Sequence, residues 1–530
     1  MADPTTTNDD AAPAPGVDRR WFLAAGGATA GALALGGLAA CSDDGSDGAK
    51  ATTTTTTTAA AAAGSGTIRT ADVPDQDQIY GWIEKIVEQG VRRPGYDADT
   101  WAEGWIEDRF QAIGLDHVRT EPVTVLRWEP SAWSLTATPA TGAARQITGF
   151  PVPFAAPTDG LELELAAFDP AAPEGVDGKA ALVDSPLISI PAGLLATAGS
   201  APKDPTGRTI DPDGTLEGAT HLVPFSTSFT EVMEPAIAGG AAAFIGSLVD
   251  YPGDSCRYFV PYDGKERPIP GLWISGSDGA WLHEQLATGP VQVKVAVEST
   301  AKEHTSHNII GELPGADDQT VMIGSHHDGP WASAVEDASG TSLVLAQAAY
   351  WAAQPRAARP HRLLFILQGG HMSGGAGMLA YIEAHRDELA DVVLEVHLEH
   401  AALEFAEIDG KVAPTGRPVP RWWFTSRIPP LEAAVSAALT AEGVNRSMLL
   451  APDAFGTQPP TDGAFYHSEG VPIVQFLEAP FYLFDEMDTL DKIDQEHLVP
   501  ITRAVIRIID STAGTSAQAM RAAEVKPSAG

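Results

Sequence analysis

Between residue 299 and the end of the chain, short apolar runs alternate with segments whose apolar residues recur at helical spacing. Continuous apolar runs of this length predict buried strands, and the 3.6-residue period predicts helices between them. The expected strands are 308–313, 320–323, 362–367, 392–398 and 471–476, and the expected helices are 339–351, capped by Ser339, and 498–509. Such alternation predicts an α/β fold with a mainly parallel, mixed sheet and helices on both faces.

The segment 67–148 is assigned to the same domain. Residues 75–89 carry isoleucines at helical spacing, and a second helix is expected from Asp99 or Thr100 to Gly114. This second helix is expected to turn Trp101, Trp105, Phe110 and Ile113 inward. Strand-like runs follow at 123–128 and 133–137.

Residues 149–298 show a different sequence pattern. Short apolar runs that predict strands follow directly after glycines, as at Gly178 and Gly239-Gly240. They predict an inserted smaller α/β or β-rich domain, with a surface loop at 202–220. Their order of elements resembles the protease-associated domain, an insert that precedes the catalytic core of several extracytoplasmic peptidases. The peptidase-like catalytic domain is expected at 299–515, and a disordered tail at 516–530.

The N-terminus reads as a targeting signal. Arg19-Arg20 before an Ala/Gly/Leu-rich stretch has the twin-arginine form, and Leu38-Ala39-Ala40-Cys41 resembles the lipobox of bacterial lipoproteins. We expect residues 1–41 to be a twin-arginine lipoprotein signal lipidated at Cys41, and 42–66 to be a disordered linker. The resulting localisation is export by the twin-arginine route and a lipid anchor on the outer face of the cell membrane. The alternative is an N-terminal transmembrane anchor.

Composition excludes some partners. The 530 residues contain 70 acidic and 33 basic side chains, a formal net charge of -37, which repels nucleic acid. Of the two cysteines, lipidation of Cys41 leaves Cys256 alone, so no internal disulfide is expected.

The chemistry is expected where strand 320–323 ends, in the segment Gly324-Ser325-His326-His327-Asp328. Glu336 and Asp337 follow, just before a small-residue turn into a helix. Imidazole and carboxylate groups can converge on one metal ion at such an edge, where α/β sheets bind ligands. The pattern favours a metal-dependent hydrolase.

The residues at the end of strand 320–323 are part of a longer sequence pattern. From Asn308 to the last helix, the chain resembles the co-catalytic zinc aminopeptidases, peptidase family 28, related to glutamate carboxypeptidase and the transferrin receptor. His326 and Asp328 match the family's His-x-Asp directly. The bridging carboxylate position holds Glu336, the Glu-Glu pair holds His371-Met372, and the later Asp position holds Glu399. The final His position holds Phe484.

The resemblance implies one divalent metal ion, zinc by analogy, held by His326, Glu336 and Glu399. Met372 and Phe484 cannot ligate a second ion, because a thioether is a poor ligand for such a cation and a phenyl ring is none. Asp485 is a tentative substitute ligand.

The resemblance also implies roles for neighbouring groups. Asp328 would orient His326, and His371 would act as the catalytic base, become a fourth ligand, or stand idle. His327, His397 and His400 are expected to be packed or surface residues.

We therefore expect an extracytoplasmic metal-dependent peptidase that hydrolyses peptide substrates in the manner of an aminopeptidase, with an altered single-metal site. The alternative is a catalytically inactive lipoprotein that keeps the fold for binding or scaffolding. The transferrin receptor branch shows that this fold can lose its chemistry.

Overall fold

The computed structural model describes residues 67–169, 171–191, 209–224, 228–454 and 458–525. The predicted signal, the linker and Cys41 lie outside these residues. Within them, no helix combines the length and apolarity needed to cross a bilayer. Cys256 is buried and unpaired, and burial raises the pKa of its thiol to about 11.

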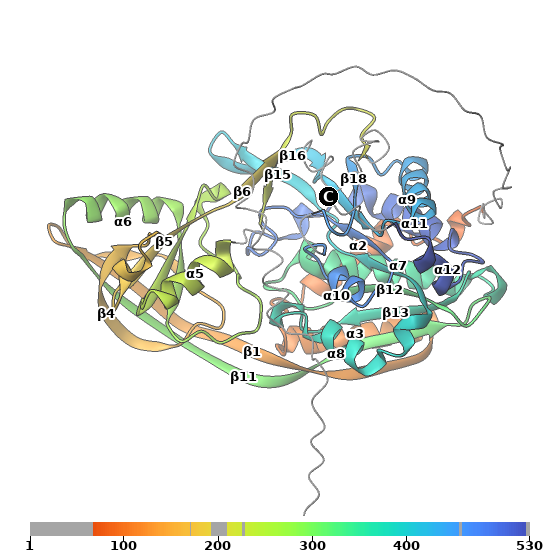
Figure 1. Cartoon of the computed structure of the whole chain (residues 1–530), viewed down its shortest axis with the longest axis horizontal. Helices are drawn as coiled ribbons and strands as arrows, with labels where there is room; N and C mark the ends of the chain where they lie inside the picture. The colour runs from red at the N-terminus through yellow and green to blue at the C-terminus, as the bar shows by residue number, and fades with distance from the viewer. Residues whose placement is uncertain (1–66, 170, 192–208, 225–227, 455–457, 526–530) are drawn as a thin grey trace, which may run out of the picture.

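The described chain contains one 15-stranded sheet whose central strands are parallel (Figure 1). Its strands run in the order β3 (Gly149–Pro151), β10 (Gly271–Ser275), β9 (Ala243–Val249), β5 (Ala180–Pro186), β4 (Thr158–Ala167), β11 (Val291–Leu313), β13 (Arg362–Gln368), β12 (Thr320–His326), β14 (Val392–Leu398), β19 (Ile473–Leu477), β17 (Arg421–Thr425), β18 (Ser447–Leu450) and β7 (Thr209–Ile210). Beside this path, β1 (Asp116–Pro139) pairs with β11 and with β2 (Arg145–Ile147). Two-stranded sheets join β15 (Leu403–Ile408) to β16 (Lys411–Pro418) and β6 (Ile188–Pro191) to β8 (Thr220–Val223).

Helices cover both faces of the parallel strands, as predicted. Val321 and Ile323 of β12 pack into one core, whereas Met322 between them packs into the other, because alternate strand residues face opposite sides. The first face is covered by α2 (Gln76–Val87), α3 (Asp97–Ile113), α7 (Gly340–Ala353), α9 (Pro429–Glu442) and α11 (Leu498–Asp510). The second is covered by α8 (Ala376–His385) and α10 (Gly463–Ser468).

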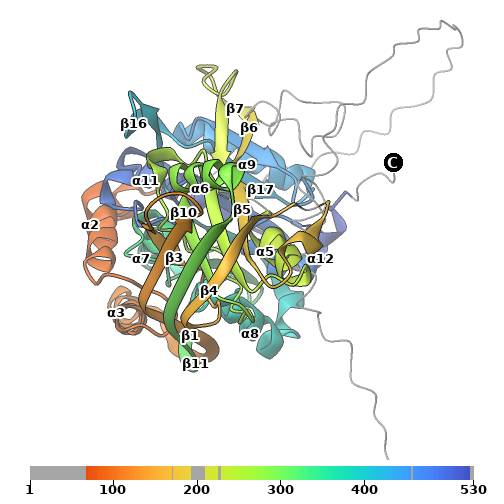
Figure 2. The same ribbon diagram turned by 90° about the vertical axis from the view of Figure 1, so that its left-hand side faces the viewer.

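The segment 149–298 forms a second part of the molecule, with α5 (Ser228–Ala238), α6 (Gly276–Thr288) and strands β3, β4, β5, β9 and β10. It is joined to the rest by β1 and β11, a long antiparallel pair that runs under both parts (Figures 1 and 2). The predicted boundary at residues 298 and 299 falls inside β11. The resemblance to a protease-associated domain stays a prediction.

Three local expectations are corrected. Ser339 precedes α7 but makes no capping bond; its Oγ donates to the Val335 carbonyl and accepts from the Ala401 amide. Of the α3 residues expected to point inward, Phe110 is fully buried, while Trp101 and Trp105 are half-buried and stack on each other. The tail predicted to be disordered contains α12 (Ala517–Ala522), so that prediction is wrong up to residue 525, whose amide donates to the Arg427 carbonyl.

Candidate metal centre

The site lies where the neighbouring strands β13, β12, β14 and β19 end. His326 is the last residue of β12, His371 opens a short helical turn after β13, and His400 follows β14. Glu336 lies in the turn before α7, and Asp462 directly precedes α10. Since parallel strands end at one edge of the sheet, five segments distant in sequence deliver their side chains to one place.

Glu336 stands at the centre of the site. Its Oε1 lies 3.4 Å from Nε2 of His326 and 3.6 Å from Nε2 of His371, and its Oε2 lies 2.5 Å from Nε2 of His400. Glu336 is 1% exposed. Burial alone would raise the pKa of its carboxyl, but the charges of His400 and His326 hold it well below its usual range.

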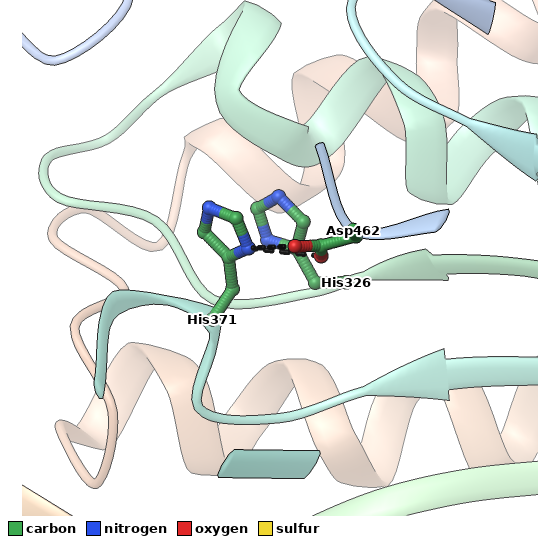
Figure 3. A group of neighbouring side chains, drawn as sticks. All are labelled: His326, His371 and Asp462. Atoms are coloured by element: carbon green, nitrogen blue, oxygen red, sulfur yellow. Dashed lines mark hydrogen bonds and ion pairs between the residues drawn. The ribbon is translucent and has the colours of Figure 1, made fainter. Parts of the chain in front are cut away.

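His371 is fixed by Asp462. The ring nitrogen Nδ1 of His371 lies 2.8 Å from Asp462 Oδ1, and its ring stacks on that of His326 with centroids 4.0 Å apart (Figure 3). Burial lowers the pKa of His371, but the Asp462 carboxylate outweighs burial and raises it to about 10. Asp462 was not among the site residues predicted from the sequence, and its place directly before a helix was the available signal.

Asp328 does not act on His326 as predicted. Nδ1 of His326 lies 2.9 Å from the Asp328 backbone carbonyl and 4.0 Å from its carboxylate. The carboxylate instead accepts the backbone amides of His371 and Met372, at 3.0 and 2.8 Å. Asp328 therefore holds the 371–372 turn in place, and its backbone orients His326.

The predicted ligand Glu399 does not join His326 and Glu336 in one group of donors. Its Oε1 lies 3.2 Å from Nε2 of His397, and the two group with Asp462 instead. Nδ1 of His397 faces Glu395 at 2.9 Å. Asp485 also lies outside every group of potential ligands among the described residues; it accepts from Ser255 Oγ and the Met487 amide.

The positions matched to a second ion are filled by apolar side chains. Met372 and Phe484 are fully buried in the same core. Tyr262, from the segment 149–298, places its ring 4.9 Å from that of Phe484 and 5.1 Å from that of His371. Among the described residues, neither Met372 nor Phe484 belongs to a group of potential metal ligands.

A separate buried group, Asp99, Glu103 and His327, is a structural link. Nδ1 of His327 lies 3.0 Å from Asp99, and its Nε2 lies 2.9 Å from the His307 carbonyl. Glu103 accepts from Ser306 Oγ and the His307 amide. Burial lowers the pKa of His327, but the Asp99 carboxylate outweighs burial and raises it to about 9. The contact between Asp99 and His327 links α3 to the end of β12.

The donor atoms around Glu336 fit a divalent metal ion. Within the described residues, neither oxygen of Glu336 and neither Nε2 of His326 and His400 makes a hydrogen bond, although all are buried. Such atoms carry a large cost unless something binds them. The donors of these three residues all lie within 4.8 Å of one another, and imidazole and carboxylate suit zinc and related ions.

Comparison with known proteins agrees with this chemistry. Residues 308–509 match the family described as Peptidase family M28. This part of the chain is thus similar to an M28 peptidase domain. A 98-residue stretch is 34% identical to "Leucine aminopeptidase 2" of Arthroderma otae, covering 18% of this chain and 19% of that protein. The chain thus spans about a fifth of the length of that relative.

Solved structures share the fold over much more than the M28-like part of the chain. The Peptidase M28 precursor from Shewanella amazonensis has a TM-score of 0.62 at 21% identity, over 85% of this chain and 94% of that one. An aminopeptidase from Aneurinibacillus sp. strain AM-1 has a TM-score of 0.57 at 20% identity, over 84% and 95%. BSAP, a zinc aminopeptidase from Bacillus subtilis, has 0.57 at 18%, over 84% and 96%. The predicted resemblance to peptidase family 28 and the predicted fold class are confirmed, and the protease-associated insert and the altered metal site stay predictions.

Proposed function

We propose that the chain is an extracytoplasmic metal-dependent peptidase that cleaves peptide bonds in the manner of an aminopeptidase. The observation that carries this proposal is the set of buried, unbonded donor atoms around Glu336, at the strand edge of an M28-like domain. Peptides are the proposed substrate class and zinc the proposed metal. A bound zinc ion would polarise the scissile carbonyl and acidify a water molecule.

The proposed site holds one ion, not two. Met372 and Phe484 supply no ligand for a second ion, and the ring of Tyr262 packs between Phe484 and His371. A single ion with an open position is sufficient for hydrolysis.

The proposed catalytic group is His371, and Asp328 is the residue that positions it. Asp462 holds Nδ1 of His371, which leaves Nε2 free to hold or move a proton beside Glu336. Asp328 fixes the backbone of the turn that carries His371. His371 is the least buried imidazole of the site, at 9% exposure, so a substrate reaches it first.

One observation favours the second candidate, a non-catalytic binding lipoprotein. The site is almost closed to solvent, with Tyr262 stacked over His371. In that case the fold would persist without turnover.

Metal analysis and peptide digestion of the purified full-length protein separate the two. We expect about one equivalent of zinc, as in a single-ion catalytic site, with release of N-terminal residues from peptides but not from acetylated peptides. Chelation and His326→Ala should abolish both zinc and turnover. His283→Ala, in a surface ion pair on α6, is the matched control and should change neither. A zinc-free protein without turnover across a peptide library contradicts the peptidase and supports the binding protein.

The membrane anchor is tested separately. A palmitate analogue should label the wild-type chain in cells but not Cys41→Ala. Equal labelling of both would refute lipidation at Cys41.

A further inference from the structure

The hydrogen bonds of His326 and His400 show which ring nitrogen of each is left to bind a metal ion. Nδ1 of His326 faces the Asp328 carbonyl, and Nδ1 of His400 faces the Glu478 carbonyl at 2.7 Å. A carbonyl oxygen only accepts, so each Nδ1 carries a proton, and each Nε2 is the atom that offers a lone pair when the ring is neutral, as metal binding requires. Fixing one ring nitrogen in this way is how proteins orient metal-binding imidazoles.

Both Nε2 atoms point at the same carboxylate. Nε2 of His326 and Nε2 of His400 approach opposite oxygens of Glu336, at 3.4 and 2.5 Å, without hydrogen-bond geometry. His397 differs, because both of its ring nitrogens face carboxylates, those of Glu395 and Glu399. Among the described residues, Nε2 of His397 also makes no hydrogen bond, but it groups with Glu399 and Asp462 and not with His326 and Glu336.

We propose that the metal ion is held by His326 Nε2, the Glu336 carboxylate and His400 Nε2, so that His400 takes the role assigned above to Glu399. Two imidazoles and one carboxylate form a known catalytic zinc set with one position left open. The assignment rests on the single-metal peptidase proposed above and specifies its ligands.

The backbone explains why His400 reaches the site. Strand β14 ends at Leu398, and the Glu399 amide still donates to the Phe476 carbonyl of β19. His400 then has φ of +60°, a left-handed conformation that non-glycine residues seldom adopt. This turn breaks the strand alternation and swings the imidazole towards Glu336.

Hydrogen bonds to neighbouring segments hold the backbone that carries His400 and Glu336 in place. The Ala401 amide donates to Ser339 Oγ at 2.9 Å, and the His400 amide lies 3.3 Å from Asp337 Oδ1. Asp488 accepts the amides of Val335 and Glu336 at 2.8 and 2.9 Å. The two ligands are therefore set in position before any ion binds, which lowers the cost of binding it.

The test measures metal affinity, not activity. Apo protein of full length is titrated with Co²⁺ and Zn²⁺ by calorimetry and by visible absorption. We expect His400→Ala to lose more than about 100-fold in affinity, beyond the 10- to 100-fold typical of outer-shell groups. Glu399→Gln is the matched control, since it keeps a side chain of the same size against His397, and it should stay within about threefold of wild type.

A second pair of variants gives a signal that unfolding cannot mimic. His400→Cys loaded with Co²⁺ should show a sulfur-to-cobalt charge-transfer band in the near ultraviolet, and Glu399→Cys should not. A band in Glu399→Cys alone, or weak binding in Glu399→Gln with full binding in His400→Ala, overturns the assignment while leaving a metalloenzyme. Wild-type protein that binds neither ion overturns both the assignment and the proposed function.

Discussion

Asp462 and His371, 91 residues apart in the chain, are joined by a hydrogen bond of 2.8 Å from the imidazole Nδ1 to the carboxylate. Both are buried, and the same Asp462 carboxylate lies 3.8 Å from Nε2 of His397. One carboxylate thus faces two histidines, and only the first of them also faces Glu336.

Asp462→Asn should slow catalysis without removing the metal. The amide keeps the size of the side chain but not its charge, so His371 loses the partner that fixes its ring and its proton. We expect kcat to fall about 10²- to 10⁴-fold, the range for a positioned proton-transfer group. Steady-state kinetics and metal content measure the two effects. Asp453→Asn, in a surface pair with Arg427, should retain full activity, and loss of the metal from Asp462→Asn would contradict the assigned role.

Restoring donors at the two apolar positions should create a second metal site. The double variant Met372→Glu with Phe484→His replaces each side chain with one of similar volume that can ligate. Metal content should rise from about one to about two equivalents per chain, as in two-metal hydrolases. Each single variant should remain near one. Two equivalents in the unmodified protein would show that the second site was never lost.

Acid should destabilise the fold through His221, which is remote from the site in sequence. His221 is buried against Trp422, with ring centroids 5.6 Å apart, and burial lowers its pKa to about 4, despite a bond with the Ala479 backbone. The pKa of His221 is lower in the folded state than in the unfolded state. His221 therefore has little effect on the free energy of unfolding above about pH 6.5, and it lowers that free energy as the pH falls from about 6.5 to 4.

The loss due to His221 should reach about 2 kcal/mol at pH 5. Urea unfolding of wild type and His221→Gln at pH 7.5 and pH 5 measures it as a difference between the two proteins. The variant should show a smaller loss on acidification. Equal losses would mean that His221 is protonated in the folded state.

Arg421 should be essential for stability. It is fully buried, 2.9 Å from Glu478 and 2.5 Å from Asp494. Burial raises the pKa of Glu478 to about 8 even beside this guanidinium. Arg421→Leu removes the guanidinium that both buried acidic side chains face, and should lower the free energy of unfolding by about 3–5 kcal/mol.

The control for Arg421 is Arg427→Leu. Arg427 pairs with Asp453 at the surface, so this substitution should cost less than about 1 kcal/mol. Denaturant titration compares the two variants. Similar losses in both would argue against a special role for the buried cation.

Sequence pattern predicted the central elements well, because apolar run length and period follow directly from burial. Strand β14 has the predicted limits 392–398, and α11 begins at the predicted Leu498. Pattern did not predict that the runs 123–128 and 133–137 belong to one strand, β1, because that continuity comes from pairing with β11. Pairing between distant strands leaves no local signature.

The site was harder to predict than the fold. His326, Glu336 and His371 were recognised and do lie together, since each is fixed by its position at the end of a strand or the start of a helix. His400 was expected to be a packed or surface residue, because nothing in the sequence signals the left-handed backbone that turns it towards Glu336. Which carboxylate faces which histidine depends on five separate segments, and no spacing within one segment encodes it.

The long β1–β11 pair has a consequence for how this molecule can be dissected. Each of these strands contributes backbone hydrogen bonds to both parts of the molecule. Excising residues 149–298 would cut β11 in mid-strand and expose the edge of β1, and exposed edges promote aggregation. Residues 149–298 are therefore not a removable insert, and versions of this chain that lack them should aggregate more readily than the full-length protein.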